Sequence, residues 1–285
     1  MSEFFAVLAA LSFATSHVLI RRGLVTSNAI TGSFISLCVS AGTLWMMVPF
    51  FVPLADFQTP AVWYFLIGGI FAPALGRILN FTGIEKIGVA RSVSITNTSP
   101  IFASILAVLI VGEAWTLQNV FGTSLVVLGI VMLSRTRTER AQWRKLDLIY
   151  PALGALSFGI ASNLRKLGLQ VQNLPLMASV VTATTAVLFA FGVVQARGGR
   201  QVLAVSRTSL GWFLASGLTN TVGMLSGFYA LSVGKIVIVD PLIGTNPVFS
   251  ILLTAIFLRD LEVITLRVMM GGVCTVIGSI FVMTV

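Results

Sequence analysis

The chain consists of long apolar stretches separated by short polar gaps. Nine stretches carry no charged residue, and a tenth, 61–84, is interrupted only by Arg77. The nine are 4–20, 29–55, 92–112, 114–134, 148–164, 167–196, 208–234, 241–258 and 268–285. Because a helix needs about 20 mostly apolar residues to cross a bilayer, the pattern predicts an all-α integral membrane protein with ten transmembrane helices.

Turn residues fall in the gaps, for example at Asn173-Leu174-Pro175 and Arg197-Gly198-Gly199-Arg200. The longest polar segment is 135–147, which we interpret as a linker. It divides the chain into a first unit, 1–134, and a second unit, 148–285, with five predicted spans each. No segment between the spans is long enough for a soluble domain.

The two units resemble each other in sequence. Three motifs of the first half recur in the same order in the second half, 145, 147 and 149 positions later. The pairs are Ala10-Leu11-Ser12-Phe13 with Ala155-Leu156-Ser157-Phe158, Pro100-Ile101-Phe102 with Pro247-Val248-Phe249, and Glu113-x-x-Thr116-Leu117 with Glu262-x-x-Thr265-Leu266. This spacing indicates a duplicated and fused unit.

Five spans per unit is an odd number, so the second unit must enter the membrane from the opposite side to the first. The sequence therefore predicts two inverted five-helix repeats, related by a pseudo-two-fold axis in the membrane plane. In proteins built this way the substrate site usually lies near the midplane, between the repeats.

Composition excludes several classes of protein. Charged residues make up 9% of the chain, against about 25% in soluble domains. The net charge of +9 does not indicate nucleic-acid binding, because no basic run is interleaved with aromatic residues.

Cys38 and Cys274 lie alone in apolar stretches, which favours buried thiols over a metal site, and we expect no cofactor. The first apolar stretch lacks a basic n-region and a cleavage site, so we expect a retained helix.

The basic residues predict an orientation. The odd-numbered predicted loops, including the linker, hold fourteen of them, whereas the even-numbered loops hold three, Arg165, Lys166 and Lys235. Since cytoplasmic loops carry the excess of Lys and Arg, we expect the linker in the cytoplasm and both termini outside.

Small residues at a spacing of four mark close helix contacts. Gly68-x-x-x-Ala72-x-x-x-Gly76 and Gly223-x-x-x-Gly227 occupy matching positions in the two units. We interpret both as interhelical ridges, with the lining of a substrate path as the alternative.

Several motifs resemble those of a known family. The segment Gly112-Glu113-Ala114-Trp115-Thr116-Leu117-Gln118, followed by Gly122 and Gly129, is similar to the close of an EamA-type domain. The preceding span contains Pro100, as those domains do, and Ile20-Arg21-Arg22-Gly23-Leu24 is similar to the end of the family's first helix. Two such domains resemble the drug/metabolite transporter superfamily over essentially the whole chain.

The chain departs from this family at several points. Phe13 and Phe158 stand where the family often has Trp, and the second close, Leu258-Arg259-Asp260-Leu261-Glu262, lacks the Gly-Glu pair. Members are commonly drawn with both termini in the cytoplasm, opposite to the orientation that the loop charges predict.

Charged residues inside a membrane are candidates for function, because their desolvation must be offset. Asp240 lies between Val237-Ile238-Val239 and Pro241-Leu242-Ile243. One interpretation is a salt bridge to Lys235 or an arginine. The other is a proton-coupling site, since burial favours the neutral form of a carboxyl group.

Other polar residues share helical faces with charged ones. Arg77 is three residues from Asn80, and Arg91 forms a stripe with Ser94 and Thr98, with Asn97 beside it. Snorkelling towards the interface is the alternative for both arginines. His17, Asn163 and Asn246 complete the set of candidate polar residues. Ser162, which precedes Asn163, is the repeat partner of His17. For His17 the alternative is an interhelical hydrogen bond. Glu113 and Glu262 precede the fifth and tenth spans, where we expect them to cap helix starts.

These features predict a secondary transporter that exports a small polar or amphipathic metabolite, with coupling to protons at Asp240. The predicted substrate-binding residues are His17, Arg77, Asn80, Arg91, Ser94, Asn97, Asn163, Asp240 and Asn246. The excess of arginine favours an anionic or zwitterionic substrate, and no ATP-binding loop occurs. The alternatives are a lipid or polyprenyl-carrier flippase on the same fold, and a membrane enzyme. The single histidine and the absence of catalytic motifs disfavour the enzyme.

The expected location is the plasma membrane, which in a bacterium is the inner membrane. The expected partners are a small-molecule substrate and membrane lipids, with no nucleic acid. We expect a monomer or a homodimer.

Overall fold

The computed structural model describes residues 1–87, 95–96, 98–134, 144–199, 203, 205–257 and 266–283, and the elements in these residues are all helical. The first half contains α1 (Ser2–Gly23), α2 (Ala29–Phe51), α3 (Ala61–Gly69), η3 (Ile70–Leu75), α4 (Gly76–Ile87), α6 (Ser99–Leu106), η4 (Ala107–Val111) and α7 (Leu117–Ser134). The second half contains α8 (Ile149–Val171), α9 (Pro175–Ala196), α10 (Arg207–Val233), α11 (Ile236–Ile243), α12 (Asn246–Phe257) and α13 (Leu266–Met283). Short helices η1 (Leu24–Thr26), η2 (Leu54–Gln58) and η5 (Lys145–Leu148) lie between these elements.

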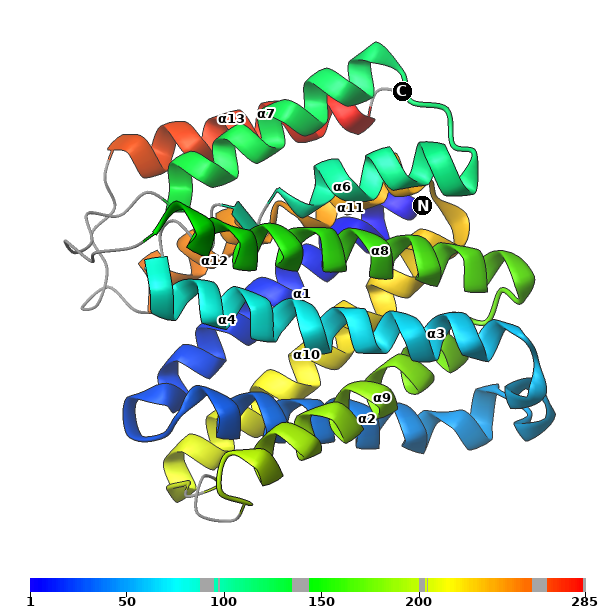
Figure 1. Cartoon of the computed structure of the whole chain (residues 1–285), viewed down its shortest axis with the longest axis vertical. Helices are drawn as coiled ribbons and strands as arrows, with labels where there is room; N and C mark the ends of the chain where they lie inside the picture. Colours follow the sequence, from blue (N-terminus) through cyan, green and yellow to red (C-terminus); the bar gives the residue numbers. More distant parts are fainter. Residues whose placement is uncertain are drawn as a thin grey trace.

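Several of the described helices have the apolar composition of membrane spans. Within the described residues, four are long and apolar enough to cross a bilayer: Ser2–Ile20, Ile30–Phe51, Ala61–Leu79 and Pro175–Ala196. Shorter apolar helices cover Ser99–Val111, Leu117–Met132, Ile236–Ser250 and Met270–Val282. In Figure 1 the helices lie beside one another, and both chain termini are at the same side of the molecule.

Helix packing between the two halves follows a reciprocal pattern. Helix α1 packs most extensively on α10, and in the same way α8 packs on α3 and α4. Helix α6 packs on α8, as α11 and α12 pack on α1. The pairs α2 with α9 and α7 with α13 each join equivalent elements. If each helix is replaced by its equivalent in the other half, each of these contacts therefore becomes another observed contact or becomes itself.

Two aromatic side chains at equivalent positions pack on two equivalent glycines. A Cβ added at Gly223 would lie 2.8 Å from the ring of Phe13, and one added at Gly76 would lie 3.0 Å from the ring of Phe158. The Phe residues are 145 positions apart and the glycines 147 apart. The small-residue ridges are thus confirmed as interhelical contacts, since only a hydrogen fits beneath each ring.

Helix boundaries differ from the prediction in two ways. The predicted gap at Arg165 and Lys166 is wrong, because α8 continues through both residues to Val171 and turns only before Pro175. Both cations donate to backbone carbonyls inside the protein, so neither has to end the helix.

The third and ninth predicted spans are interrupted rather than continuous. The backbone leaves helical geometry at Ala72, before Pro73, and α11 ends at Ile243, two residues after Pro241. Proline lacks the N–H that would continue the helix and clashes with the preceding turn. Both interruptions leave polar backbone groups within the predicted membrane region.

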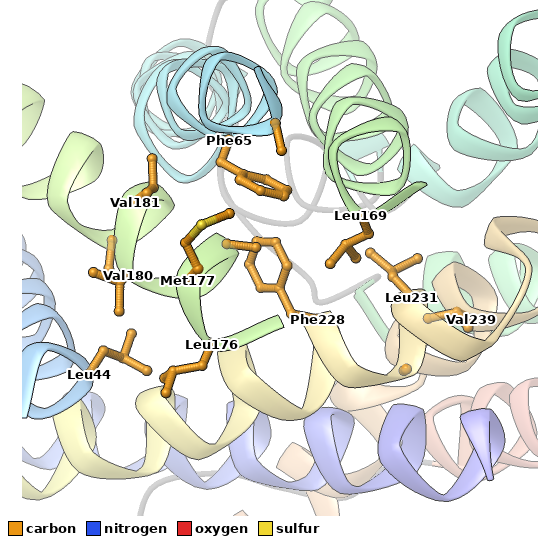
Figure 2. Close-up of a cluster of buried hydrophobic side chains, with 14 of the residues drawn as sticks. Leu44, Phe65, Leu169, Leu176, Met177, Val180, Val181, Phe228, Leu231 and Val239 are labelled. Carbon is orange, nitrogen blue, oxygen red and sulfur yellow. The ribbon is translucent and has the colours of Figure 1, made fainter. Parts of the chain in front are cut away.

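An apolar cluster joins the two halves at one end of the molecule (Figure 2). Phe65 and Met177 are fully buried in it, and the rings of Phe65 and Phe228 meet edge to face with centroids 6.1 Å apart. The cluster draws on α1, α2, α3, α6, η4, α8, α9, α10 and α11. It lies where α8 and α10 end and α9 begins, on the same side as both termini (Figures 1 and 2).

Candidate functional site

Asp240 lies on α11 and contacts α8 through a side-chain hydrogen bond. The Ser162 hydroxyl donates to Asp240 Oδ1 at 2.7 Å. Ser162 is buried and Asp240 partly buried. A hydrogen bond to a charged group is worth about 1.5–3 kcal/mol, so this contact fixes the two helices relative to each other at the carboxyl group.

Arg165 is one turn beyond Ser162 on α8 and near enough to Asp240 to interact with it electrostatically. Its Nη2 donates to the carbonyl of Ala72 at 2.8 Å. Its guanidinium also lies over the ring of Phe228, 5.4 Å from the centroid. Arg165 Nε is buried and has no hydrogen-bond partner among the described residues. The interrupted backbone at Ala72 thus provides an acceptor for the cation that faces Asp240.

Sequence reasoning missed Ser162 and Arg165 as members of this site. Ser162 was considered only as the repeat partner of His17, and Arg165 was assigned to a loop. The sequence did carry a signal for Arg165. The turn residues Asn173-Leu174-Pro175 place the end of this helix well beyond Arg165.

Asn163 does not share this position. Its Nδ2 donates to the carbonyls of Ala103 on α6, at 3.0 Å, and Gly159 on its own helix, at 2.9 Å. The side chain is 2% exposed. Asn163 therefore joins α8 to α6, whereas the sequence analysis expected it to bind substrate.

His17 and Arg77 form a second polar group, from α1 and α4. The charge of Arg77 acts on His17. His17 shares a helical face with Phe13, which contacts α10, and with fully buried Ala10. The imidazole is nevertheless exposed, so there is open space beside it on this inner face of α1. The charge of Arg77 beside the imidazole suits an anionic group.

The remaining predicted residues are less informative. Asn246 donates to the carbonyl of Ile243 at 3.2 Å and so lies at the interruption between α11 and α12. Arg91, Ser94 and Asn97 lie outside the described residues, as does the side chain of Asn80. Within the described residues, no three His, Cys, Asp or Glu side chains come together to hold a metal ion.

Glu113 caps a helix, but a different one from the helix that follows it in sequence. Its carboxylate accepts the backbone N–H groups of Ile236, at 2.8 Å, and Val237, at 3.1 Å. These are the first residues of α11, which carries Asp240. The expectation that Glu113 caps the start of the fifth span is therefore wrong, because the turn after η4 directs the carboxylate to the other half. Glu262 lies outside the described residues.

Comparison with known proteins agrees with these helices and their pairing. The model of the family described as "EamA-like transporter family" matches twice, at residues 1–135 and 146–284. A solved structure described only as "Crystal structure of protein" is similar with a TM-score of 0.82, at 15% sequence identity, over 98% of this chain and 95% of that chain. At this identity the likeness shows the fold alone. The comparison with curated proteins finds no match.

Proposed function

Since this chain belongs to the EamA-like transporter family and contains its domain twice, we propose that it is a secondary transporter that exports a small polar or amphipathic metabolite. Transport proceeds by alternating access between two inverted five-helix repeats. The contact of Asp240 with Ser162 beside Arg165 carries this proposal, because it places an ionisable carboxyl group and a cation together inside a membrane domain.

The reciprocal packing supports inverted repeats of five spans each. A pseudo-two-fold axis requires each contact between the halves to have a counterpart with the halves exchanged. The pair Phe13 on Gly223 and the pair Phe158 on Gly76 meet this requirement at the level of single side chains. Ten spans result when α3 to α4, α6 with η4, and α11 to α12 each count as one interrupted span. An even number also agrees with the two termini on one side in Figure 1.

Asp240 is the proposed coupling residue. As a carboxylate it interacts with Arg165 and accepts the hydrogen bond of Ser162. When it takes up a proton, its attraction for a cationic group of the substrate is lost, so proton and substrate compete for the carboxyl group. This competition couples the export of substrate to the entry of protons.

His17 and Arg77 extend the proposed site towards the first half. The positive charge of Arg77 favours an anionic group, and Asp240 favours a cationic one, so a zwitterionic or anionic substrate suits the two groups best. Asn246, together with Asn80, Arg91, Ser94 and Asn97, stays in the proposal as a hydrogen-bonding residue of the same site.

The loop charges favour the linker in the cytoplasm. Arg165 and Lys166 were two of the three basic residues counted on the opposite side, yet both donate to backbone carbonyls within the protein. Removing them from the loop count increases the asymmetry between the two sides. We therefore orient both termini outwards and the cluster of Figure 2 at the outer end.

Reconstituted transport tests the proposal. A panel of amino acids, organic acids and amines is first screened for a rise in melting temperature of the purified protein, because a ligand that binds only the folded state stabilises it. The compound found is then followed in proteoliposomes under an imposed pH gradient. Gradient-driven flux of this solute is expected. Movement of fluorescent lipid without solute flux would instead support the lipid or polyprenyl-carrier flippase.

A further inference from the structure

The junction between α10 and α11 is held from two sides by opposite charges. Lys166 Nζ donates to the carbonyls of Leu231, at 2.7 Å, and Gly234, at 2.6 Å, where α10 ends. Glu113 accepts the first two N–H groups of α11 at 2.8 and 3.1 Å. The backbone groups that a helix end leaves unpaired are thus satisfied by side chains from α8 and from the segment after η4.

Helix α11 has little stability of its own. It has eight residues, of which the first four are Ile236, Val237, Ile238 and Val239, and it contains Pro241. β-branched residues lower helix propensity, proline removes one hydrogen bond, and isolated short helices are marginal. The position of α11 therefore depends on the groups at its ends and on packing, and Glu113 is the side chain that caps its start.

Asp240 lies one turn from the capped residues. It follows Ile236 by four positions, so a shift of the first turn of α11 moves the carboxyl group relative to Ser162 on α8. The charge of Glu113 also acts on both Lys166 and Asp240. Lys166 is the neighbour of Arg165 on α8. The capping groups and the proposed coupling site are consequently connected through both α8 and α11.

We propose that Glu113 and Lys166 are positioning residues for Asp240. By holding the junction of α10 and α11, they keep the carboxyl group against Ser162 and near Arg165 in the described conformation. The same contacts tie α8, α10 and α11 together beside the cluster of Figure 2, where Leu231 and Val239 are labelled. This inference rests on the proposed coupling role of Asp240, because it gives the two residues a function through that group.

Chemical labelling of Asp240 tests the positioning without a substrate. The purified full-length protein is treated with dicyclohexylcarbodiimide, which modifies carboxyl groups in apolar surroundings, and the peptide containing Asp240 is quantified by mass spectrometry. We expect Glu113→Gln and Lys166→Met to raise the labelling rate of Asp240 about fivefold or more, since the loss of a helix cap releases the first turn. Ser162→Ala removes the hydrogen bond itself, so it gives the labelling rate of Asp240 that is expected when the contact is lost completely.

Lys235→Met is the matched control. Lys235 is an exposed cation in the same junction whose side chain does not cap α11, so its loss should change the labelling rate by less than about twofold. Melting temperatures of the variants identify unfolding, and Glu113→Gln, which keeps an acceptor for one N–H group, is the variant least subject to it. Unchanged labelling in both folded variants would overturn the proposal, as would an equal increase in Lys235→Met.

The positioning role of Glu113 and Lys166 and the coupling role of Asp240 can fail independently of each other. If Asp240→Asn abolishes gradient-driven transport while Glu113→Gln and Lys166→Met leave labelling unchanged, the coupling role stands and the positioning role is wrong. If labelling responds to both variants but Asp240→Asn transports normally, the capping groups do position Asp240, and the coupling role is wrong.

Discussion

Ser162 and Asp240 are 78 residues apart in sequence, yet the hydroxyl of one donates to the carboxyl group of the other at 2.7 Å. Both residues belong to the second half of the chain, on α8 and α11. The matching positions of the first half carry His17 and Val93. The two halves share the same fold, but the residues that make this polar contact occur in the second half. The contact therefore marks the position where we propose the transport chemistry.

Ser162→Ala should reduce gradient-driven transport about tenfold, because a hydrogen bond to a charged group contributes about 1.5–3 kcal/mol. The initial rate of solute flux in proteoliposomes measures the effect. Ser179→Ala is the control, since Ser179 is also buried but its hydroxyl donates to the carbonyl of Pro175 on its own helix. Equal losses in the two variants would show that the Ser162 contact has no special role.

Arg165→Met should abolish transport and lower the melting temperature. The substitution leaves the buried Ala72 carbonyl without its donor and removes a positive charge near Asp240, and an unsatisfied buried acceptor costs about 1–3 kcal/mol. Arg165→Lys keeps the charge but not the planar contact with Phe228, so it should retain more stability than Arg165→Met. A variant Arg165→Met that transports at the normal rate would exclude Arg165 from the site.

Gly223→Ala and Gly76→Ala should destabilise the protein to a similar degree. Each added methyl group meets the ring of Phe13 or Phe158 at about 3 Å, and overpacking typically costs about 1–3 kcal/mol. Gly42→Ala is the control, because nothing lies within 4 Å of a Cβ at that position. Thermal unfolding in detergent should show lower melting temperatures for the first two variants and an unchanged melting temperature for Gly42→Ala. Strongly unequal effects of Gly223→Ala and Gly76→Ala would contradict the pseudo-two-fold arrangement.

A reporter that folds only in the cytoplasm should be active within the linker, 135–147, and inactive at the C-terminus. The expectation follows from the loop charges once Arg165 and Lys166 are placed inside α8. Activity of the reporter at the C-terminus would reverse the proposed orientation and place the cluster of Figure 2 at the inner end.

The sequence predicted the features that depend on periodicity and small residues. The turn at Asn173-Leu174-Pro175 lies between α8 and α9 as expected, and the glycine ridges make the interhelical contacts that their spacing indicated. These features are local in sequence, or they recur in both copies of the repeat. Neither kind requires knowledge of how the halves pack.

The features that the sequence did not predict depend on contacts between distant segments. Arg165 and Lys166 looked like loop residues because a free cation is costly in a membrane, and only the carbonyls that accept their hydrogen bonds make α8 continuous. Glu113 was assigned to the nearest helix start, whereas the packing of the two halves brings it to α11. The acceptor at Ala72 likewise exists only because the helix is interrupted there.

Flux of the identified solute through the Asp240→Asn variant tests the central proposal most directly. Asparagine keeps the size of the side chain and an acceptor for Ser162 but removes the ionisable group. Wild-type proteoliposomes should accumulate the solute under a pH gradient, and the Asp240→Asn variant should show no response to that gradient while still binding the solute in thermal-shift measurements. Transport by Asp240→Asn at the wild-type rate, with the same dependence on pH, would contradict proton coupling at this residue.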